Sequence, residues 1–350
     1  MTQPKLALIL GATGGIGSEL ARRLHESGWT VRALHRDPAS LKGRNEAYEW
    51  VRGDAMVQAD VVAAAQGAAL IVHGVNPPGY RNWGTLVLPM IDNTIAAARA
   101  SGARIVLPGT IYNFGPDAWP ELTEDSPQHP ETRKGRIRAE MEARLRGASR
   151  DGVKTLIVRA GDFFGPGAAN NWFSQGLVTP GQPVTRILSP GRRGVGHEWA
   201  YLPDVAETML QLVERETDLE SFAVFHMQGH WDADGTQITG AIRRVTTAAA
   251  SVAASKESPA RSVAREPRVW PFPWLVVTLA SPFVALFAEM REMRYLWREP
   301  LRMRNSRLVR FLGEEPHTPL DDAVHTTLVG LGCLAPSAVG AGRTLKSLAY

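Results

Sequence analysis

Short apolar runs alternate with longer amphipathic stretches through the first half of the chain. Residues 6–10 form a continuous apolar run, the pattern of a strand that is buried on both faces of a parallel sheet. Residues 18–26 and 83–100 are typical of helices. Further apolar runs predict strands at residues 29–35, 48–52, 69–73 and 104–107. Strands that alternate with helices in this way predict an α/β fold with a Rossmann-type, doubly wound parallel sheet.

The remainder of the chain predicts a smaller C-terminal lobe that binds the substrate. We expect a dinucleotide-binding domain over residues 1–165, with strands near residues 155 and 222 returning to its sheet, and a mainly substrate-binding lobe over residues 166–350. Residues 270–288 are apolar but interrupted by a proline, which favours a buried helix over a bilayer span. Contact with a membrane surface is the less favoured alternative, because several arginines follow directly.

The first predicted strand leads into a glycine-rich turn, GATGGIG. One glycine permits a tight turn, one lets a pyrophosphate approach the backbone, and one lets the next helix pack on the strand. Unpaired amides at the start of that helix then face the phosphates, and the helix dipole favours their negative charge. The turn predicts dinucleotide binding by Gly11, Thr13, Gly14, Gly15, Ile16 and Gly17.

The end of the second predicted strand indicates which cofactor binds. A chain that prefers NAD usually has an acidic residue there, which holds the ribose 2′-hydroxyl. Here the residue is His35, followed by Arg36, and an arginine can pair with a 2′-phosphate. NADP (as NADPH) is therefore expected rather than NAD. Asp54 is a candidate for the adenine amino group or for the cap of the next helix, and His73 and Gly74 are expected to pass beneath the cofactor.

Several motifs in the same order resemble one protein family. GATGGIG, Asp54, the turn at His73 and GTIYNFG at residues 109–115 resemble the extended branch of the short-chain dehydrogenase/reductase superfamily, which includes nucleotide-sugar epimerases and dehydratases. VRAGDFFGPG at residues 158–167 and HEWAYLPDVAE at residues 197–207 are similar to later stretches of that branch. The resemblance implies a Rossmann fold and hydride chemistry with a nicotinamide cofactor. It also raises the expectation of a homodimer.

The catalytic residues depart from the pattern of that family. Extended members carry a Tyr, then a Lys four residues later and a Glu four residues after the Lys. The Tyr acts as acid and base, and the Lys holds the nicotinamide ribose. Anchoring the stretch TRKGRIRAE on Glu140 places Thr132 at the Tyr position and Arg136 at the Lys position. A threonine hydroxyl does not ionise near neutral pH, and an arginine does not exchange a proton.

Other residues are candidates for the missing roles. Thr110 matches the family's Ser or Thr that hydrogen-bonds the substrate oxygen, although its hydroxyl could instead cap the local backbone. Tyr112 is a candidate acid that shares a face with Thr110 if the backbone is extended, and a packed aromatic residue is the alternative. Lys134 could reach the ribose or the substrate, or belong with Arg136 to a solvated basic turn.

Polar and aromatic side chains around a Gly-Pro-Gly loop predict the substrate pocket, with a plain surface loop as the alternative. The candidates there are Asn171 and Trp172, with Asp162, Asn170 and Gln175 close by in the sequence. Arg193, in a basic turn, is a candidate for an anionic group of the substrate. We expect no metal site, because His226, His230 and Asp232 do not show persuasive ligand spacing.

Composition narrows the class of protein. The chain has 350 residues, of which 44% are hydrophobic and 21% charged, as in ordinary globular proteins. A net charge of +4, spread along the chain, suits anionic small molecules better than nucleic acid. The single cysteine, Cys333, excludes an internal disulfide and a cysteine-rich zinc site and fits a reducing compartment. A strand begins almost at residue 1, so we expect no signal peptide and a cytoplasmic protein.

Together these observations predict an NADP-dependent oxidoreductase that acts on a carbonyl or alcohol of a small organic substrate, with a non-standard catalytic centre. One alternative is an epimerase or dehydratase that retains its cofactor. The other is a non-catalytic, NADP-binding sensor or partner protein, which the missing Tyr and Lys suggest.

Overall fold

A seven-stranded parallel sheet forms the centre of the computed structural model, which describes residues 5–77, 82–168, 171–257 and 266–336. The strand order is β11-β7-β5-β4-β1-β2-β3, with every neighbouring pair parallel. The strands are β1 (Leu6–Leu10), β2 (Thr30–His35), β3 (Glu49–Arg52), β4 (Ala68–His73), β5 (Arg104–Thr110), β7 (Thr155–Ala160) and β11 (Phe222–His226). This order confirms the doubly wound, Rossmann-type sheet.

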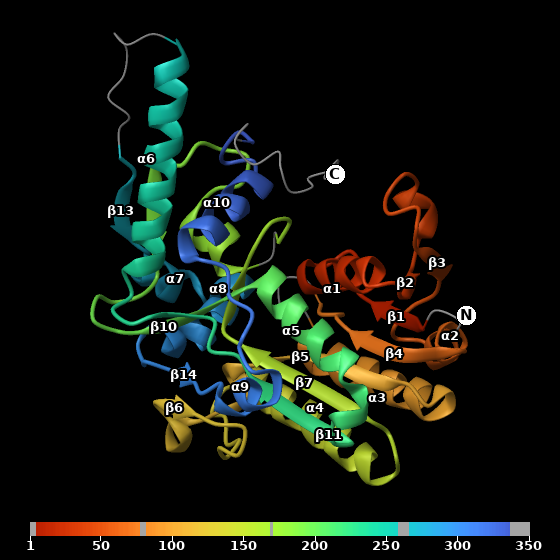
Figure 1. Ribbon diagram of the computed structural model, residues 1–350. Helices are drawn as coiled ribbons and strands as arrows, with labels where there is room; N and C mark the ends of the chain where they lie inside the picture. Colours follow the sequence, from red (N-terminus) through yellow and green to blue (C-terminus); the bar gives the residue numbers. More distant parts are fainter. Residues whose placement is uncertain (1–4, 78–81, 169–170, 258–265, 337–350) are drawn as a thin grey trace.

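Helices cover both faces of the sheet (Figure 1). Alternate strand residues point to opposite faces, so Ala7 and Ile9 pack on one side while Leu8 and Leu10 pack on the other. One face carries α1 (Gly15–Glu26), α5 (Leu202–Glu214) and α9 (Ser306–Leu312). The other face carries α2 (Gln58–Ala64), α3 (Trp83–Ser101) and α4 (Arg133–Arg150). Burial on both faces explains the continuous apolar run of β1 and the short apolar runs inside the other central strands, whereas the edge strand β3 is only half-buried.

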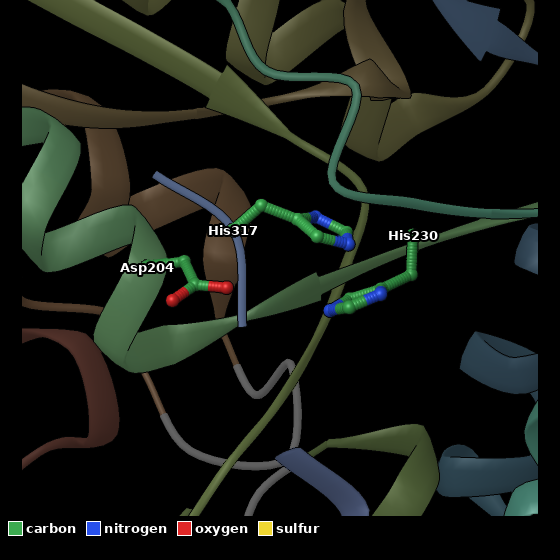
Figure 2. Close-up of side chains that lie close together, drawn as sticks. All are labelled: Asp204, His230 and His317. Carbon is green, nitrogen blue, oxygen red and sulfur yellow. The ribbon is translucent and has the colours of Figure 1, made fainter. Parts of the chain in front are cut away.

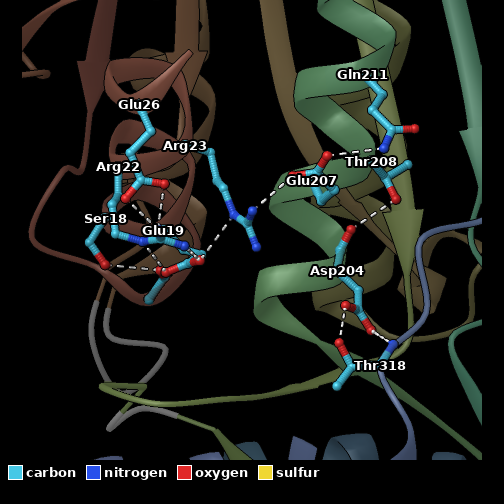
Figure 3. A network of polar contacts seen from close by, with 11 residues as sticks. Ser18, Glu19, Arg22, Arg23, Glu26, Asp204, Glu207, Thr208, Gln211 and Thr318 are labelled. Carbon is cyan, nitrogen blue, oxygen red and sulfur yellow. Dashed lines mark hydrogen bonds and ion pairs between the residues drawn. The ribbon is translucent and has the colours of Figure 1, made fainter. Parts of the chain in front are cut away.

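Helices α1 and α5 are joined by a polar network (Figure 3). The Arg23 guanidinium of α1 lies 3.0 Å from the Glu207 carboxylate of α5. At the other end of the pair, a Cβ atom added to Gly15 would lie 3.1 Å from the Leu202 side chain. The start of α5 therefore lies directly beside the glycine-rich turn, and the second lobe begins near this point.

The second lobe is built on small sheets and two long helices. Its apolar core includes Phe164, Trp199, Ile242 and Leu328. The elements are β8 (Asp162–Phe164), β9 (Arg186–Ser189), β10 (His197–Tyr201), β12 (His230–Asp232), β13 (Arg268–Pro271), α6 (Gln237–Glu257), α7 (Trp274–Ala280), α8 (Ala285–Glu292) and α10 (Leu320–Gly330). A short pair, β6 (Glu121–Leu122) with β14 (Arg302–Met303), ties this lobe to the edge of the first.

Short helical turns complete the described chain. They are η1 (Pro38–Leu41), η3 (Ile111–Asn113), η4 (Pro116–Ala118), η5 (Phe173–Leu177), η6 (Glu216–Asp218) and η7 (Met293–Trp297). Of these, η3 directly follows β5. Ile111 of η3, Leu296 of η7 and Met303 of β14 pack together in a separate apolar cluster. Two of these turns, η3 and η7, therefore lie near the carboxyl ends of the central strands.

The apolar stretch at residues 270–288 is not the buried helix that the sequence predicts. Helices α7 and α8 form a surface hairpin in which Leu275, Leu279 and Phe283 are 73%, 68% and 88% exposed. Val277 of α7 faces inward at 2% exposure. An apolar composition does not determine which side of a short helix packs on the core. In this stretch most of the large apolar side chains are exposed to solvent. Across the described residues, no helix has the length and apolar character needed to cross a membrane.

Candidate active site

The glycine-rich turn between β1 and α1 is too tightly packed for side chains. Gly11 has a φ of +94°, and a Cβ atom there would lie 2.7 Å from the carbonyl of Gly74. A Cβ atom on Gly17 would lie 2.2 Å from the carbonyl oxygen of Gly11. Gly14 precedes the first residue of α1 and supplies no capping side chain, so the first amides of the helix have no side-chain acceptor there. This cradle fits a pyrophosphate group.

The remaining predicted residues of the turn divide by exposure. Thr13 is exposed at the tip of the turn, whereas Ile16 is buried in the core between α1 and the sheet. Gly74, which follows β4, lies against both Gly11 and Gly17. The turn and the end of β4 therefore form one continuous backbone surface.

At the end of β2, Arg36 is exposed and directly follows His35. The His35 ring packs edge-on to Trp50 with centroids 6.2 Å apart, and its Nδ1 accepts a hydrogen bond of 3.1 Å from the Asp37 amide. The guanidinium of Arg36 thus stands beyond the strand end where an adenosine ribose is expected.

Asp54 makes an Asx turn after β3. Its Oδ1 accepts a hydrogen bond of 3.0 Å from the amide of Met56. The helix-cap alternative is wrong, because α2 starts at Gln58 and its N-cap position is Val57. Contact of Asp54 with an adenine stays a prediction.

His73 ends β4 in a fully buried position. Its Nδ1 lies 2.8 Å from the hydroxyl of Thr94, which donates in turn to the Met90 carbonyl. Nδ1 therefore carries the proton, and Nε2 is left as an acceptor. Burial, and then the positive charge of Arg138, lowers the pKa of His73 to about 3. The ring is therefore neutral at pH 7. The effect of Arg138 on this pKa shows that its positive charge lies near the end of β4.

A buried ion pair fixes which face of α4 meets the site. Glu142 Oε2 lies 2.5 Å from Arg159 Nη2 of β7, and Glu142 Oε1 lies 3.1 Å from Nε of the same guanidinium. Lys134 and Arg138 precede Glu142 at four-residue spacing, so all three lie along one side of the helix. Arg136 and Glu140 are exposed on the other side.

The positions that the sequence-based alignment chose do not lie on this face. The inner face of α4 carries Lys134, Arg138 and Glu142 instead of Arg136 and Glu140, because a shift of two residues turns a helix position to the opposite face. Thr132 is instead the N-cap of α4 and accepts a hydrogen bond of 3.0 Å from the Gly135 amide. Arg136 does not face the strand ends, and its guanidinium donates to the Glu131 carbonyl at 3.0 Å.

Lys134 is fully buried at the start of α4. Its Nζ lies 2.5 Å from Glu289 Oε2 and 3.1 Å from Glu292 Oε2, and it donates to the Glu289 carbonyl at 2.9 Å. Burial alone would raise the pKa of Glu292, but hydrogen bonds from Lys134 and its charge outweigh burial and lower that pKa. Two carboxylates of α8 thus hold the Lys134 ammonium in place, and the solvated-turn alternative for Lys134 is wrong.

Arg138 reaches from α4 to the segment that follows β4. Its guanidinium lies over the Trp83 ring, 5.0 Å from the centroid, and Nη2 lies 3.4 Å from the Asn76 Oδ1. With His73 beside it, Arg138 stands next to the backbone that touches the glycine-rich turn. A cationic, planar donor at this place suits the hydroxyls of a ribose.

Thr110 and Tyr112 do not share an extended face as expected. The chain turns into η3 after β5, and the Thr110 hydroxyl accepts a hydrogen bond of 3.1 Å from the Tyr112 amide. Thr110 thus makes the local cap that was its alternative role, and its hydroxyl hydrogen is still available to another acceptor. The Tyr112 ring packs half-buried on the cluster that contains Phe114. A Cβ atom on Gly135 would lie 2.4 Å from the Tyr112 carbonyl, so η3 lies against the start of α4.

The predicted substrate residues have structural partners. Asn171 Oδ1 accepts from the Ser174 amide at 2.8 Å, and its amide donates to the Ala168 carbonyl at 2.9 Å. Trp172 packs edge-on to Trp297 with centroids 5.2 Å apart. Arg193 is exposed, and Asn170 lies outside the described residues. Their contact with a substrate stays a prediction.

The three residues considered for a metal do not converge as a group. His226 Nε2 lies 2.8 Å from a guanidinium nitrogen of Arg159. Asp232 caps the start of α6 by accepting from successive amides, including that of Ile238 at 3.1 Å. His230 is not part of either arrangement.

Sequence reasoning also missed Arg138 and Glu142. The signal for them was the apolar spacing of Ile137, Met141 and Leu145, which marks the inner face of α4.

Comparison with known proteins agrees with this geometry. Residues 11–165 match a family model described as NAD(P)H-binding. A search of curated proteins finds no match. Among solved structures, a Burkholderia cenocepacia J2315 protein named as an epimerase has a TM-score of 0.69 at 16% identity, covering 94% of this chain and 98% of its own.

Two further structures give the same picture. UDP-glucuronic acid 4-epimerase from Bacillus cereus, solved with NAD, has a TM-score of 0.65 at 14% identity, with 93% of this chain and 98% of its own covered. The Bordetella bronchiseptica enzyme WbmH, solved with NAD⁺, has a TM-score of 0.62 at 16% identity, with 94% and 98% covered. Residues 11–165 are therefore similar to NAD(P)H-binding domains, and the described chain has the same fold as these three solved structures.

Proposed function

We propose that this chain is an NADP-dependent oxidoreductase that acts on a carbonyl or alcohol of a small organic substrate. The observation that carries the proposal is the placement of Lys134 and Arg138 on the inner face of α4. Arg138 reaches the segment after β4, and the start of α4 that carries Lys134 lies against η3. Lys134 is a cation that can exchange a proton, and Arg138 is a cation that cannot.

Each residue of the site has a role in the proposed reaction that its chemistry allows. When bound, the nicotinamide ring gives or takes the hydride. The first amides of α1 and the glycine-rich turn hold the pyrophosphate, and Arg138 orients the ribose next to it. The Thr110 hydroxyl donates a hydrogen bond to the substrate oxygen. The Lys134 ammonium donates a proton to that oxygen during reduction and takes it back in the reverse direction.

The preference for NADP rests on Arg36. Its guanidinium is exposed directly after β2, where a 2′-phosphate would be attached to the ribose. Two neighbouring solved structures, the enzyme WbmH and a UDP-glucuronic acid 4-epimerase, contain NAD. Cofactor preference among related folds follows the residues at this strand end rather than the fold. We therefore expect NADPH to bind more tightly than NADH.

An epimerase with a retained cofactor is the second candidate. Similarity of fold over more than nine-tenths of the chain to nucleotide-sugar epimerases favours it. In that chemistry the hydride returns to the substrate, so the cofactor is unchanged after turnover. The two candidates therefore differ in whether cofactor is consumed.

The first test is a titration of the full chain with NADPH and with NADH, in which quenching of the fluorescence of its ten tryptophans reports binding. The second test measures turnover of a panel of aldehydes, ketones and alcohols. We expect Arg36→Ala to weaken NADPH about tenfold or more while NADH changes little. Lys134→Met should abolish turnover with NADPH binding retained, whereas Arg136→Ala should change neither.

Three outcomes would contradict the proposal. Equal losses for both cofactors in Arg36→Ala would remove the NADP assignment. A cofactor that co-purifies and stays unchanged through turnover of nucleotide sugars would move the function to the epimerase. Tight cofactor binding with full turnover in Lys134→Met would show that Lys134 is not the proton donor, and binding with no turnover of any substrate would favour a sensor.

A further inference from the structure

Asp204, His230 and His317 lie close together outside the residues assigned to cofactor and catalysis (Figure 2). One ligand atom from each lies within 4.8 Å of the other two. The three side chains come from separate parts of the chain: the first turn of α5, the first residue of β12 and the segment before α10. Two imidazoles and a carboxylate are a common donor set for divalent transition metals.

His230 has a buried nitrogen that the described residues leave without a hydrogen bond. The residue is 8% exposed, and its Nε2 has no partner among them. Figure 2 shows its ring turned toward His317, and the two ring centroids lie 4.4 Å apart. A buried imidazole nitrogen without a hydrogen bond is costly, and a bound metal ion would satisfy it.

Hydrogen bonds hold the segment around His317 on both sides. Thr318 donates to Asp204 through its amide at 2.8 Å and its hydroxyl at 2.7 Å (Figure 3). Glu315 accepts from two successive amides just before β12, at 3.0 and 2.7 Å. These contacts fix both histidine-bearing segments and orient the Asp204 carboxylate, as outer partners do around metal ligands.

We propose that Asp204, His230 and His317 bind one divalent transition-metal ion of the zinc type. Metal–ligand distances of about 2.1 Å place two ligand atoms at most about 4.2 Å apart, so a small rotation of the exposed His317 side chain closes the site. Water completes the coordination on the exposed side. The ion joins α5, β12 and the segment before α10, and it satisfies the buried nitrogen of His230.

The test uses the full chain after treatment with a chelator, titrated with Zn²⁺ in a calorimeter. We expect one ion per chain and a rise in melting temperature on binding. His317→Ala, at an exposed position that should not disturb folding, should lower the affinity at least about tenfold, and Thr318→Val about tenfold. His129→Ala removes another exposed histidine that pairs with an aspartate and should change nothing.

The result is decisive in either direction. Absence of Zn²⁺ binding by the wild-type chain overturns the site. Binding that His317→Ala leaves unchanged overturns it as well, because the ion would then sit elsewhere. Since neither readout requires turnover, the outcome is independent of the proposed oxidoreductase activity.

A second, independent observation concerns the exposed apolar side of α7 and α8. Monomeric proteins rarely expose a contiguous group of large apolar side chains without using it. We call this group the α7–α8 apolar surface. Its members come from β13, α7, the turn after α7 and α8. Their exposed fractions are Trp270 53%, Leu275 73%, Val276 57%, Leu279 68%, Phe283 88% and Leu286 44%.

Positive charge adjoins the α7–α8 apolar surface. Burial lowers the pKa of Arg294, and the nearby charges of Arg298 and Arg192 lower it further. The Arg294 guanidinium lies over the Trp274 ring, 5.0 Å from its centroid, at the base of the hairpin. The two glutamates of α8 are engaged instead in the ion pairs with Arg133 and Lys134. Large apolar side chains beside clustered guanidiniums are the combination that binds anionic membrane surfaces.

We propose that the α7–α8 apolar surface docks onto an anionic lipid bilayer, with its apolar side chains in the headgroup region and its arginines against the lipid phosphates. Short helices that lie on a membrane need no spanning segment. The clustered positive charge favours a lipid partner over a second copy of this chain, whose matching surface would carry the same charge.

The test is sedimentation of the full chain with vesicles of phosphatidylcholine alone or mixed with phosphatidylserine. We expect sedimentation with the anionic vesicles, weakened by salt, and at least about a tenfold loss for Leu275→Ser/Phe283→Ser. Val57→Ser removes an apolar side chain that is 45% exposed elsewhere and should have no effect. No sedimentation, equal sedimentation of the double variant, or a dimer that the double variant dissociates would each overturn the proposal.

Discussion

Glu142 and Arg159 pair in the core between α4 and β7, with two contacts of 2.5 and 3.1 Å between carboxylate and guanidinium. The same guanidinium lies 2.8 Å from His226 Nε2 on the neighbouring strand. One carboxylate thus joins a helix to the sheet at a single rotational setting of α4. That setting decides which residues of α4 face the strand ends.

Glu142→Gln should destabilise the fold by about 3–5 kcal/mol, because the buried Arg159 guanidinium loses its counter-charge. Urea unfolding measures the difference. Asp151→Asn is the matched control, since it breaks the exposed pair with Arg99 and should cost about 1 kcal/mol or less. A loss below about 1 kcal/mol for Glu142→Gln would mean that the pair does not hold α4.

Arg138→Ala should weaken NADPH binding about tenfold or more, because a charged donor to the ribose is removed. Arg136→Ala should leave binding unchanged, because that guanidinium faces solvent and donates to the Glu131 carbonyl. Tryptophan quenching in the two variants compares the faces of α4 directly. If Arg136→Ala weakened binding and Arg138→Ala did not, the assignment of the inner face would be wrong.

Gly17→Ala should abolish NADPH binding. The new Cβ atom would lie 2.2 Å from the Gly11 carbonyl oxygen, so the turn must open and the amides of α1 must move. Gly147→Ala is the control: its Cβ atom meets nothing within 4 Å, and the helix should gain about 0.5–1 kcal/mol. Retained binding by a folded Gly17→Ala protein would refute the cradle.

Glu198→Gln should stabilise the protein more as pH rises. Burial raises the pKa of Glu198 well above 4.5, and the charge of Glu315 adds to this, against the Met303 amide and Arg302. The folded state therefore holds the proton more tightly than the unfolded state. The stability that this group contributes is full below about pH 4.5 and is lost as pH rises through the folded-state pKa.

Urea unfolding at about pH 5 and about pH 8 measures this effect. The gain of Glu198→Gln over the wild type should be larger at the higher pH. Glu46→Gln, at an exposed position, should show no such trend. A gain that stays constant with pH would mean that Glu198 keeps an ordinary pKa.

The central sheet was predictable from the sequence because its inner strands are buried on both faces. Those strands contain short apolar runs, and the glycine turn after the first run has one physical explanation. The rotational setting of α4 was harder to predict, because Glu140 and Glu142 are both present on a helix rich in charge. The contact of Glu142 with the distant residue Arg159 shows which glutamate faces the core, and the local sequence does not contain that contact.

Two other features depend on contacts that no local pattern contains. The apolar stretch of α7 and α8 could face the core or the solvent with the same composition, and its orientation is set by what it packs against. Asp204, His230 and His317 are far apart in the sequence and meet only through the fold. Spacing along the chain therefore gave no signal for that group.

The two carboxylates on α8 also constrain which substrates can approach Lys134. Arg133 and Lys134 contribute two positive charges, and Glu289 and Glu292 contribute two negative charges in contact with them. The group is electrically balanced, so it offers no net attraction to an anion. The reacting end of the substrate is accordingly expected to be uncharged, and any phosphate or carboxylate on the molecule must find its counter-charge elsewhere on the protein.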